Sequence, residues 1–277
     1  MASENQKAKV KQATELLEQG VEDIFTSGRM AEYLTVMSKF HSYSARNCML
    51  ILMQNPEATH VAGYKAWQQK FHRQVRKGER SMTILAPITH KTTIRETNKD
   101  TGEVTDHEHV WMSFKAVPVF DISQTDGEEL PEIATDLTGD VERFDKLCKA
   151  VESAATVPVT YDAEFSDPEV HGSFNRFEKV IKVRGGMSEA QTFKTLVHET
   201  AHSILHCEGG EQVEAEQKVR EVQAEGVAFV VCNALGIDTD DYSFGYVAAW
   251  SGMDSKAVLK QLEVIRKTAD AILSKVA

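Results

Sequence analysis

The sequence predicts an α+β protein of two domains, and three observations lead to this prediction. Apolar residues recur at helical spacing near both ends of the 277-residue chain, they alternate with polar residues between about 81 and 120, and the stretch 121–140 is acidic and turn-rich like a linker. We therefore expect an N-terminal α+β domain over 1–120, a linker over 121–140, and a mainly helical C-terminal domain with a small sheet over 141–277. A chain of this length can bury a core in each domain.

Helical periodicity dominates the start of the chain. Residues 5–39 alternate charged and apolar side chains at helical spacing, and Gly20 and Gly28 are the expected breaks, so we predict two helices here. The segment SYSARNCMLILMQNP predicts a further, apolar helix with Ser42 or Ser44 as its cap. This helix should end at the Asn-Pro step, because the residue before a proline disfavours the α conformation.

The centre of the chain changes to β periodicity. After a short helix predicted around 64–71, the segments SMTILAPITHKTTIRE and HVWMSFKAVPVF alternate apolar and polar residues on either side of a polar turn. This pattern predicts a hairpin, with a third strand as an option. Further on, we predict a helix near 141–155, short strands at 157–161 and 179–183, and four helical stretches up to the C-terminus.

The composition of the chain indicates in which compartment the protein works and which partners it has. The sequence has no apolar signal segment and no run of eighteen apolar residues, so we expect a cytoplasmic protein without membrane contact. The four cysteines lie far apart without C-x-x-C spacing, which fits a reducing compartment. The net charge of −11 argues, taken alone, against a nucleic-acid partner. However, residues 1–120 carry +3 and the remainder −14, which suggests that the halves have different partners.

The segment TLVHETAHSILH carries the pattern H-E-x-x-H. His198 and His202 are four residues apart, so on a helix both imidazoles lie on one side and can bind a single metal ion. Glu199 reaches the same space and is the expected general base, taking a proton from metal-activated water and passing it to a leaving amine. Ser188 and Gln191 form an S-x-x-Q capping box at the start of this helix. The preceding strand, KVIKVR, is expected to be an edge beside the cleft to which an extended peptide adds.

A catalytic zinc site usually has three protein ligands, and a downstream helix supplies a candidate for the third. In REVQAEGVAFVVC, Glu221 lies 19 residues after His202, about the length needed to turn and return antiparallel, so we predict it as the third ligand. Glu225, one turn later, is expected to hold a ligand imidazole through its other nitrogen. His206 is the rival, but three ligands in line on a straight helix span about 12 Å, too far for one ion.

Two other interpretations of the motif remain open. The histidines can be satisfied polar groups of a buried helix without a metal, or the metal can be purely structural. A site with three protein ligands keeps its fourth position open, which favours catalysis over a structural role.

A basic segment with interleaved aromatic residues lies between 39 and 80, with eight Lys and Arg against two acids. Cations for phosphates and flat rings for unpaired bases are what binding of single-stranded nucleic acid requires. The candidate contacts are Tyr43, Arg46, Asn47, Lys65, Trp67, Arg73, Arg76, Lys77 and Arg80. The alternative is that the rings are core and the cations form a solvated face, with Tyr43 and Asn47 as a cap and a packing residue.

These segments resemble a known family. HETAHSILH with EVQAEGVAFVVC is similar to the zincin-like domain of ArdC-type and ImmA/IrrE-type proteins. The segments YSARNCMLILMQNP, GYKAWQQKFHRQVRKGERSMTILAP and FKAVPVFDISQT are similar to the N-terminal domain of ArdC-type antirestriction proteins, and the whole resemblance spans about Tyr33 to Trp250. It implies a domain that binds single-stranded DNA, joined to a zinc metallopeptidase-like domain, on a mobile genetic element that protects incoming DNA from restriction.

The resemblance also implies roles for single residues. His198, His202 and Glu221 correspond to ligands of Zn²⁺, and Glu199 to the general base. Tyr246, in a Y-x-x-x-W pattern that ends at Trp250, corresponds to a donor to the oxyanion.

We therefore expect a single-stranded-DNA-binding antirestriction protein with a gluzincin-like metallopeptidase domain that hydrolyses peptide bonds of an unidentified protein substrate. One alternative is a non-enzymatic protein that coats single-stranded DNA and holds a structural zinc ion. The other is an ImmA-like protease that cleaves one regulator.

Overall fold

The computed structural model describes residues 4–27, 29–97, 104–130, 141–237, 250 and 253–276. Helices and strands occur in both halves of this described chain, so the predicted mixed class is confirmed. None of the described helices is both long and apolar enough to cross a membrane.

The chain begins with α1 (Glu4–Ser27) and α2 (Met30–Lys39). The predicted break at Gly20 is wrong, because α1 continues through it. A β-carbon at Gly20 would lie 2.7 Å from the Sδ atom of Met49, so the glycine permits close packing of α1 on α3 and does not end a helix.

Helix α3 (Ala45–Gln54) confirms the predicted apolar helix and selects one of its two candidate caps. The Ser44 hydroxyl accepts a hydrogen bond from the backbone amide of Asn47, and the helix stops at Asn55, whose backbone is extended before the proline. Six of its residues after Arg46 are buried, so α3 lies at the centre of the N-terminal half.

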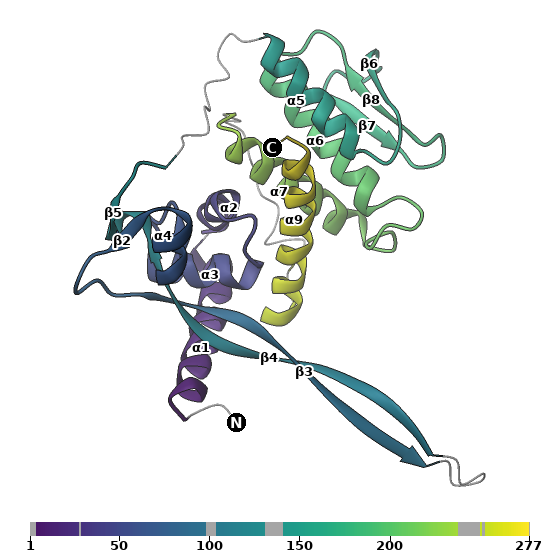
Figure 1. Cartoon of the computed structure of the whole chain (residues 1–277). Helices are drawn as coiled ribbons and strands as arrows, with labels where there is room; N and C mark the ends of the chain where they lie inside the picture. Colours follow the sequence, from purple (N-terminus) through teal and green to yellow (C-terminus); the bar gives the residue numbers. More distant parts are fainter. Residues whose placement is uncertain are drawn as a thin grey trace.

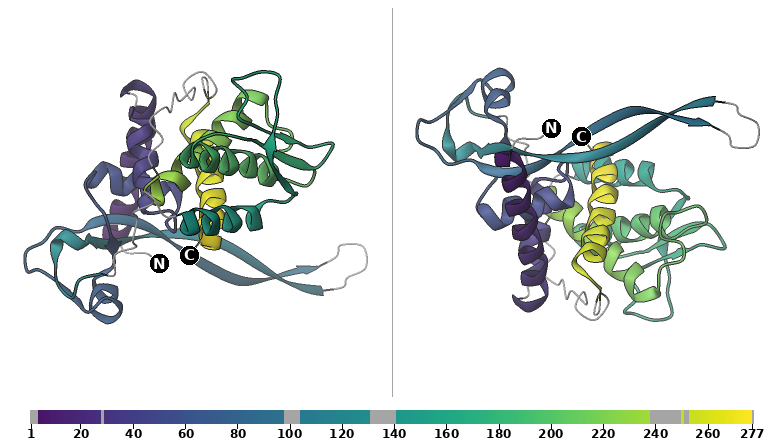
Figure 2. Two further views of the ribbon diagram at one scale, coloured as in Figure 1. Left: turned by 90° about the horizontal axis from the view of Figure 1, so that it is seen from above. Right: turned by 90° about the horizontal axis from the view of Figure 1, so that it is seen from below.

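A long β-ribbon follows. Strand β3 (Met82–Thr97) pairs antiparallel along its whole length with β4 (Val104–Asp121), as the hairpin prediction required. The third strand, β1 (Val61–Ala62), comes from upstream and pairs with the end of β4. Figures 1 and 2 show that the ribbon packs on α1 and α3 at its base and then extends away from the body of the protein.

The N-terminal half also contains one short helix and a two-stranded sheet. Helix α4 (Tyr64–Lys70) confirms the short predicted helix and precedes β2 (Arg73–Val75). Strand β2 pairs with β5 (Thr125–Gly127), which follows the 3₁₀ turn η1 (Ile122–Gln124). The first residues of the predicted linker are therefore regular structure packed on α4, whereas 131–140 lie outside the described residues.

The C-terminal half surrounds one small sheet in the order β6-β8-β7. Strand β6 (Val159–Ala163) runs parallel to β8 (Val180–Arg184), and β7 (Gly172–Asn175) runs antiparallel to it. Helices α5 (Val141–Ala154), α6 (Glu189–Leu205), α7 (Gln217–Ala234) and α9 (Ser255–Val276) complete this half. Strand β7 was absent from the sequence prediction.

One hydrophobic core runs through both halves, with buried side chains from α1, α2 and α3 and from α5, α6, α7 and α9 in one cluster. Helix α9, yellow in Figure 1, contacts α3 as well as α7. Polar contacts join the halves as well, because Ser38 Oγ donates to Asn233 Oδ1 at 2.6 Å and His41 Nδ1 lies 2.8 Å from Asp270 Oδ1. The division at 121–140 into two domains stays a prediction.

Candidate metal centre

Helix α6 carries the H-E-x-x-H motif and begins where the sequence indicates. The Ser188 hydroxyl accepts a hydrogen bond from the Gln191 amide at 3.2 Å. The second half of the predicted capping box does not form, because the Gln191 side chain instead donates to Thr195 Oγ1 at 3.2 Å. The cap fixes the start of α6 three turns before the motif, and α6 lies against β7, β8 and α7.

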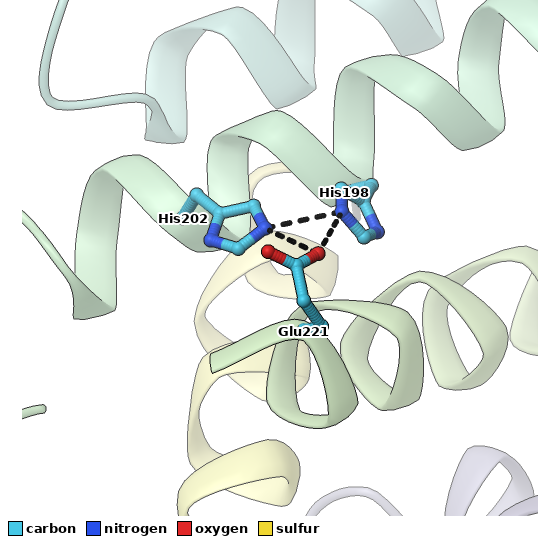
Figure 3. A group of neighbouring side chains, drawn as sticks. All are labelled: His198, His202 and Glu221. Carbon is cyan, nitrogen blue, oxygen red and sulfur yellow. Dashed lines mark hydrogen bonds and ion pairs between the residues drawn. The ribbon is translucent and has the colours of Figure 1, made fainter. Parts of the chain in front are cut away.

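Three potential ligand atoms converge between α6 and α7 (Figure 3). His202 Nε2 lies 3.1 Å from His198 Nε2, and the Oε2 atom of Glu221 lies 3.6 Å from the first imidazole and 3.5 Å from the second. In Figure 3 both imidazoles project from one helix toward the Glu221 carboxylate, which rises from the neighbouring helix. In the described part of the chain, these three residues form a group able to hold a metal ion.

The spacing of these atoms fits a metal ion. Bonds of about 2.0–2.1 Å at tetrahedral angles place ligand atoms roughly 3.3 Å apart, close to the three observed distances. Two imidazole nitrogens and one carboxylate oxygen suit Zn²⁺ and other first-row divalent ions. The predicted grouping of His198, His202 and Glu221 is thus found in the fold, and their role as ligands stays a prediction.

The far nitrogen of each imidazole has its own partner. His198 Nδ1 lies 3.2 Å from Glu225 Oε2, and Lys194 Nζ lies 3.2 Å from the other oxygen of Glu225. Glu225 therefore lies where the sequence predicted it, beside a candidate ligand. His202 Nδ1 lies 2.8 Å from His206 Nδ1, so the rival ligand His206 faces the side of His202 opposite to the metal group.

The charges in this group depend on one another. Burial alone would lower the pKa of His198, but its close contacts with the carboxylates of Glu221 and Glu225 outweigh this and raise the pKa to about 9. The same contacts with His198 and His202 hold the pKa of the Glu221 carboxyl well below its usual range. A metal ion must therefore displace a proton from His198, and metal affinity should fall as the pH is lowered.

Glu199 is 7% exposed and lies beside the ligand atoms. Burial raises the pKa of its carboxyl, and the nearby His198 and His202 offset this only in part. The backbone amide of Phe174 in β7 hydrogen-bonds to the Glu199 carboxylate. The carboxylate is thus held by the strand and faces a cavity of about 780 Å³ that β7, α6 and α7 line together.

The strand beside this cavity is not the predicted one. KVIKVR forms β8, which lies in the middle of the sheet, whereas the edge strand at the cavity is β7. The prediction that KVIKVR is an edge strand is therefore wrong, because β8 pairs with a strand on each side. Within the described residues β7 pairs with β8 alone, and an edge of this kind beside the candidate site can accept a further strand.

Several candidate DNA contacts are buried in this fold, which corrects the prediction that they form a surface. The ring of Trp67 is 1% exposed, and its Nε1 donates to the Phe120 carbonyl at 2.9 Å. The Asn47 side chain is occupied by two hydrogen bonds to the backbone of Leu85. Tyr43 is partly buried, and its hydroxyl donates to the Val61 carbonyl at 2.7 Å. These three side chains stabilise the N-terminal half and are not available to bases in this conformation.

The predicted cations divide into two groups. Arg73 donates to Thr125 Oγ1 at 2.7 Å, and Arg76 forms salt bridges with Glu79 and Asp126. Arg46 lies over the ring of Phe114, with 5.9 Å between the guanidinium carbon and the ring centroid. The side chains that remain exposed and form no salt bridge within the described part of the chain are Lys65, Lys77 and Arg80. Tyr246 lies outside the described residues.

The sequence comparison decides the affiliation of the N-terminal half. A family model for the N-terminal domain of anti-restriction factor ArdC matches residues 5–120. Residues 5–120 thus match the ArdC N-terminal domain family. The match ends one residue before the end of β4 and includes the ribbon, α3 and α4.

Two further comparisons extend the similarity beyond the ArdC domain. The antirestriction ArdC protein of the R388 plasmid, in its Mn(II)-bound crystal structure, has a TM-score of 0.56 to this chain at 21% identity, covering 96% of this chain and 98% of that one. Its metal-free structure gives a TM-score of 0.51 at 21% identity, covering 84% and 85%. At this identity the likeness shows a shared fold, which includes the C-terminal half.

A curated relative is longer. An uncharacterised protein of Bacillus anthracis is 25% identical over 282 residues, covering 88% of this chain and 47% of that protein. The chain thus spans about half the length of this relative.

Sequence reasoning missed Gly172 and Phe174 of β7, and it did not assign Gln223. The turn after β7 did carry a signal, because Asn175 Oδ1 accepts hydrogen bonds from the amides of Phe177 and Glu178, and an asparagine at this place is typical of such a turn. Gln223 carried no signal of its own, because its partners come from three separate segments.

Proposed function

We propose that this chain is an antirestriction protein that binds single-stranded DNA through its N-terminal half and hydrolyses peptide bonds at a zinc site in its C-terminal half. The family match of residues 5–120 supports the antirestriction part. The observation that carries the enzymatic part is the convergence of His198, His202 and Glu221 beside Glu199.

Zinc is proposed because two imidazoles and a carboxylate are the ligand set of many catalytic zinc sites. The R388 protein, whose fold this chain shares, has been crystallised with Mn(II). The alternative to zinc at this site is therefore another divalent ion such as Mn(II). When bound, the ion supplies a Lewis acid for the scissile carbonyl and for the attacking water.

The residues of the chain supply the proton transfers. Glu199 is held by the Phe174 amide in a buried position that raises its pKa, which brings it closer to the range useful for an acid and base at neutral pH. It can accept a proton from the attacking water and return it to the leaving amine. A substrate in extended conformation would pair with the free edge of β7, along the same cavity.

The DNA-binding proposal rests on the surface near α4. Tyr64 and Phe71 are 47% and 37% exposed, and the exposed cations Lys65, Lys77 and Arg80 lie on the same α4 to β3 segment. Tyr64, Lys77 and Phe120 also line a cavity of about 590 Å³. Rings that can stack on bases and cations that can meet phosphates are the requirements for non-specific single-strand binding.

The enzymatic part is tested by restriction assays with Glu199→Gln, which removes the base but keeps the size of the side chain. We expect the variant to retain zinc, measured by metal analysis, to retain DNA binding, and to lose both peptide hydrolysis and protection of unmodified DNA. Glu208→Gln, an exposed carboxylate beyond the end of α6, is the matched control and should behave as wild type. Protection that survives Glu199→Gln would replace this proposal by the alternative in which the protein only coats DNA.

The DNA part is tested by a salt titration of binding to a fluorescent single-stranded oligonucleotide. Replacing Lys77 and Arg80 by Gln should weaken binding and flatten the dependence of log K on log salt by about one to two units. The same double change at Lys146 and Lys149, exposed cations of α5, is the control. No binding by wild-type protein at low salt would leave the third interpretation, in which this half recognises a protein.

A further inference from the structure

A row of uncharged polar side chains, buried at His206 and Gln223 and half-buried at Gln261, lies behind His202, on the side away from the candidate metal site. His206 ends α6 and is 2% exposed, and Gln223 of α7 is fully buried. The row continues to Gln261 of α9. We propose that His206 and Gln223 are positioning residues that hold His202 in the tautomer in which Nδ1 carries the proton and Nε2 is free to bind a metal ion.

The row is continuous by distance. His202 Nδ1 lies 2.8 Å from His206 Nδ1, and His206 Nε2 lies 2.9 Å from Gln223 Oε1. Gln223 Nε2 in turn donates to Gln261 Oε1 at 2.6 Å and, at 3.3 Å, to Gln212 Oε1. Each of these hydrogen bonds therefore holds the orientation of the next side chain, from α6 through α7 to α9.

With the amides of Gln212, Gln223 and Gln261 oriented as they are in the structure, the donors and acceptors in this row leave one consistent arrangement. The amide nitrogen of Gln223 donates to two glutamine oxygens, so its oxygen faces His206 and must accept a hydrogen from His206 Nε2. A neutral His206 has one N–H, so its Nδ1 is then an acceptor, and it can only accept from Nδ1–H of His202. The lone pair of His202 is consequently on Nε2, the nitrogen that lies 3.1 Å from His198 Nε2.

The opposite orientation of the row would exclude the metal. If the amides of Gln212, Gln223 and Gln261 were all reversed, Gln223 would donate to His206 Nε2, His206 would donate from Nδ1, and His202 would carry its proton on Nε2. An N–H pointed at the site cannot coordinate an ion. The glutamine partners of Gln223 thus select the binding form of a ligand that they do not touch.

The two candidate ligands are held by different chemistry. His198 Nδ1 contacts the Glu225 carboxylate, whereas His202 Nδ1 contacts the neutral imidazole of His206, which in turn contacts the Gln223 amide. A neutral relay adds no negative charge to a site that already holds three carboxylates, those of Glu199, Glu221 and Glu225. It also ties the ligand to α9, the C-terminal helix that packs on the N-terminal half.

The first test is spectroscopic and uses metal-free protein. Nitrogen chemical shifts of ¹⁵N-labelled histidine distinguish Nδ1–H from Nε2–H, and Nε2–H is the form that a free imidazole in water prefers. We expect His202, assigned by its absence in His202→Asn, to be the Nδ1–H form in wild type and to shift toward Nε2–H in Gln223→Met. A wild-type His202 with its proton on Nε2 would overturn the proposal, whether or not the chain binds metal.

The second test measures the dissociation constant for Zn²⁺ by competition with a chromophoric chelator. His206→Phe and Gln223→Met should weaken binding by about 10- to 100-fold, the usual effect of removing a partner of a metal-binding histidine. Gln223→Glu keeps an acceptor toward His206 and should restore affinity to within a few-fold of wild type.

A control separates this effect from general destabilisation. Thr268→Val removes a buried hydroxyl of α9 that donates to the Val264 carbonyl of the same helix, so it should lower stability without changing the dissociation constant. Equal affinity of wild type, His206→Phe and Gln223→Met would overturn the relay while leaving the metal site intact. This inference rests on the proposed metal site, and wild-type protein that binds no divalent ion would instead reject that site, a distinguishable result.

Discussion

Strand β7 passes so close to α6 that a β-carbon added to Gly172 would lie 3.2 Å from Glu199 Cγ and 2.5 Å from Thr195 Cγ2. The glycine is needed for space, because its backbone angles are open to any residue. Through this contact the Phe174 amide, two residues along the strand, reaches the Glu199 carboxylate. The position of the candidate base is therefore set by a glycine on a different element.

Gly172→Ala should separate β7 from α6. We expect a loss of about 1–3 kcal/mol in the free energy of unfolding, the usual cost of overpacking, together with lower hydrolytic activity. Urea denaturation measures the first effect. Gly63→Ala is the control, because a β-carbon there meets no atom within 4 Å. Equal stability losses in the two variants would mean that the contact between β7 and α6 is looser than described.

Asn47 and Gln54 form the same double hydrogen bond from α3 to β3, one buried and one exposed. Asn47 binds the backbone N–H and C=O of Leu85 at 2.9 and 3.0 Å, and Gln54 binds those of Thr83 at 2.8 and 2.9 Å. Asn47→Ala should cost about 2–4 kcal/mol, because it leaves a buried backbone donor and acceptor without partners. Gln54→Ala should cost less than about 1 kcal/mol, because water can replace the side chain. Thermal unfolding of both variants checks the difference, which should vanish if burial is not the cause.

Tyr64 and Trp67 lie three residues apart on α4 and should respond differently in DNA binding. Tyr64 is 47% exposed, so Tyr64→Ala should weaken binding to a single-stranded oligonucleotide by about 1–3 kcal/mol, the range for a lost stacking contact. Trp67 is buried, so Trp67→Phe should lower stability and leave the affinity within about twofold. Fluorescence anisotropy measures both affinities. The opposite order would place the binding surface elsewhere.

His206 should make stability depend on pH. Burial lowers its pKa from 6.5 to about 4, so below pH 6.5 the unfolded chain takes up a proton that the folded chain refuses. Its contribution is fully present above pH 6.5 and is lost as the pH falls toward 4, by an amount on the order of 3 kcal/mol. In metal-free protein, the stability advantage of wild type over the non-titrating His206→Asn should shrink across this window. Parallel pH profiles in urea denaturation would show that His206 does not titrate in this way.

The sequence determined those features that depend on neighbours along the chain. A serine cap at the start of the apolar helix, the stop before Pro56, the long hairpin and the one-sided display of His198 and His202 all follow from local spacing, and all are found; that the cap is Ser44 was decided by the structure. The position of Glu221 could also be predicted from the sequence. It lies 19 residues after His202, about the length a chain needs to turn and pass back beside the first helix.

Only the tertiary structure decided which rings are core and which are surface. Trp67 and Tyr64 are both aromatic and lie on the same helix. Only Trp67 is buried, against β4, whereas Tyr64 is exposed. Gly20 was predicted to break a helix, but in the structure it lies inside α1 and allows close contact with α3. Likewise, β7 became the edge at the cavity only when the sheet order was known, and the row from His202 to Gln261 exists only where α6, α7 and α9 meet. Local spacing fixes the direction of a side chain on its own element, whereas burial and hydrogen-bond partners depend on segments far away in the sequence.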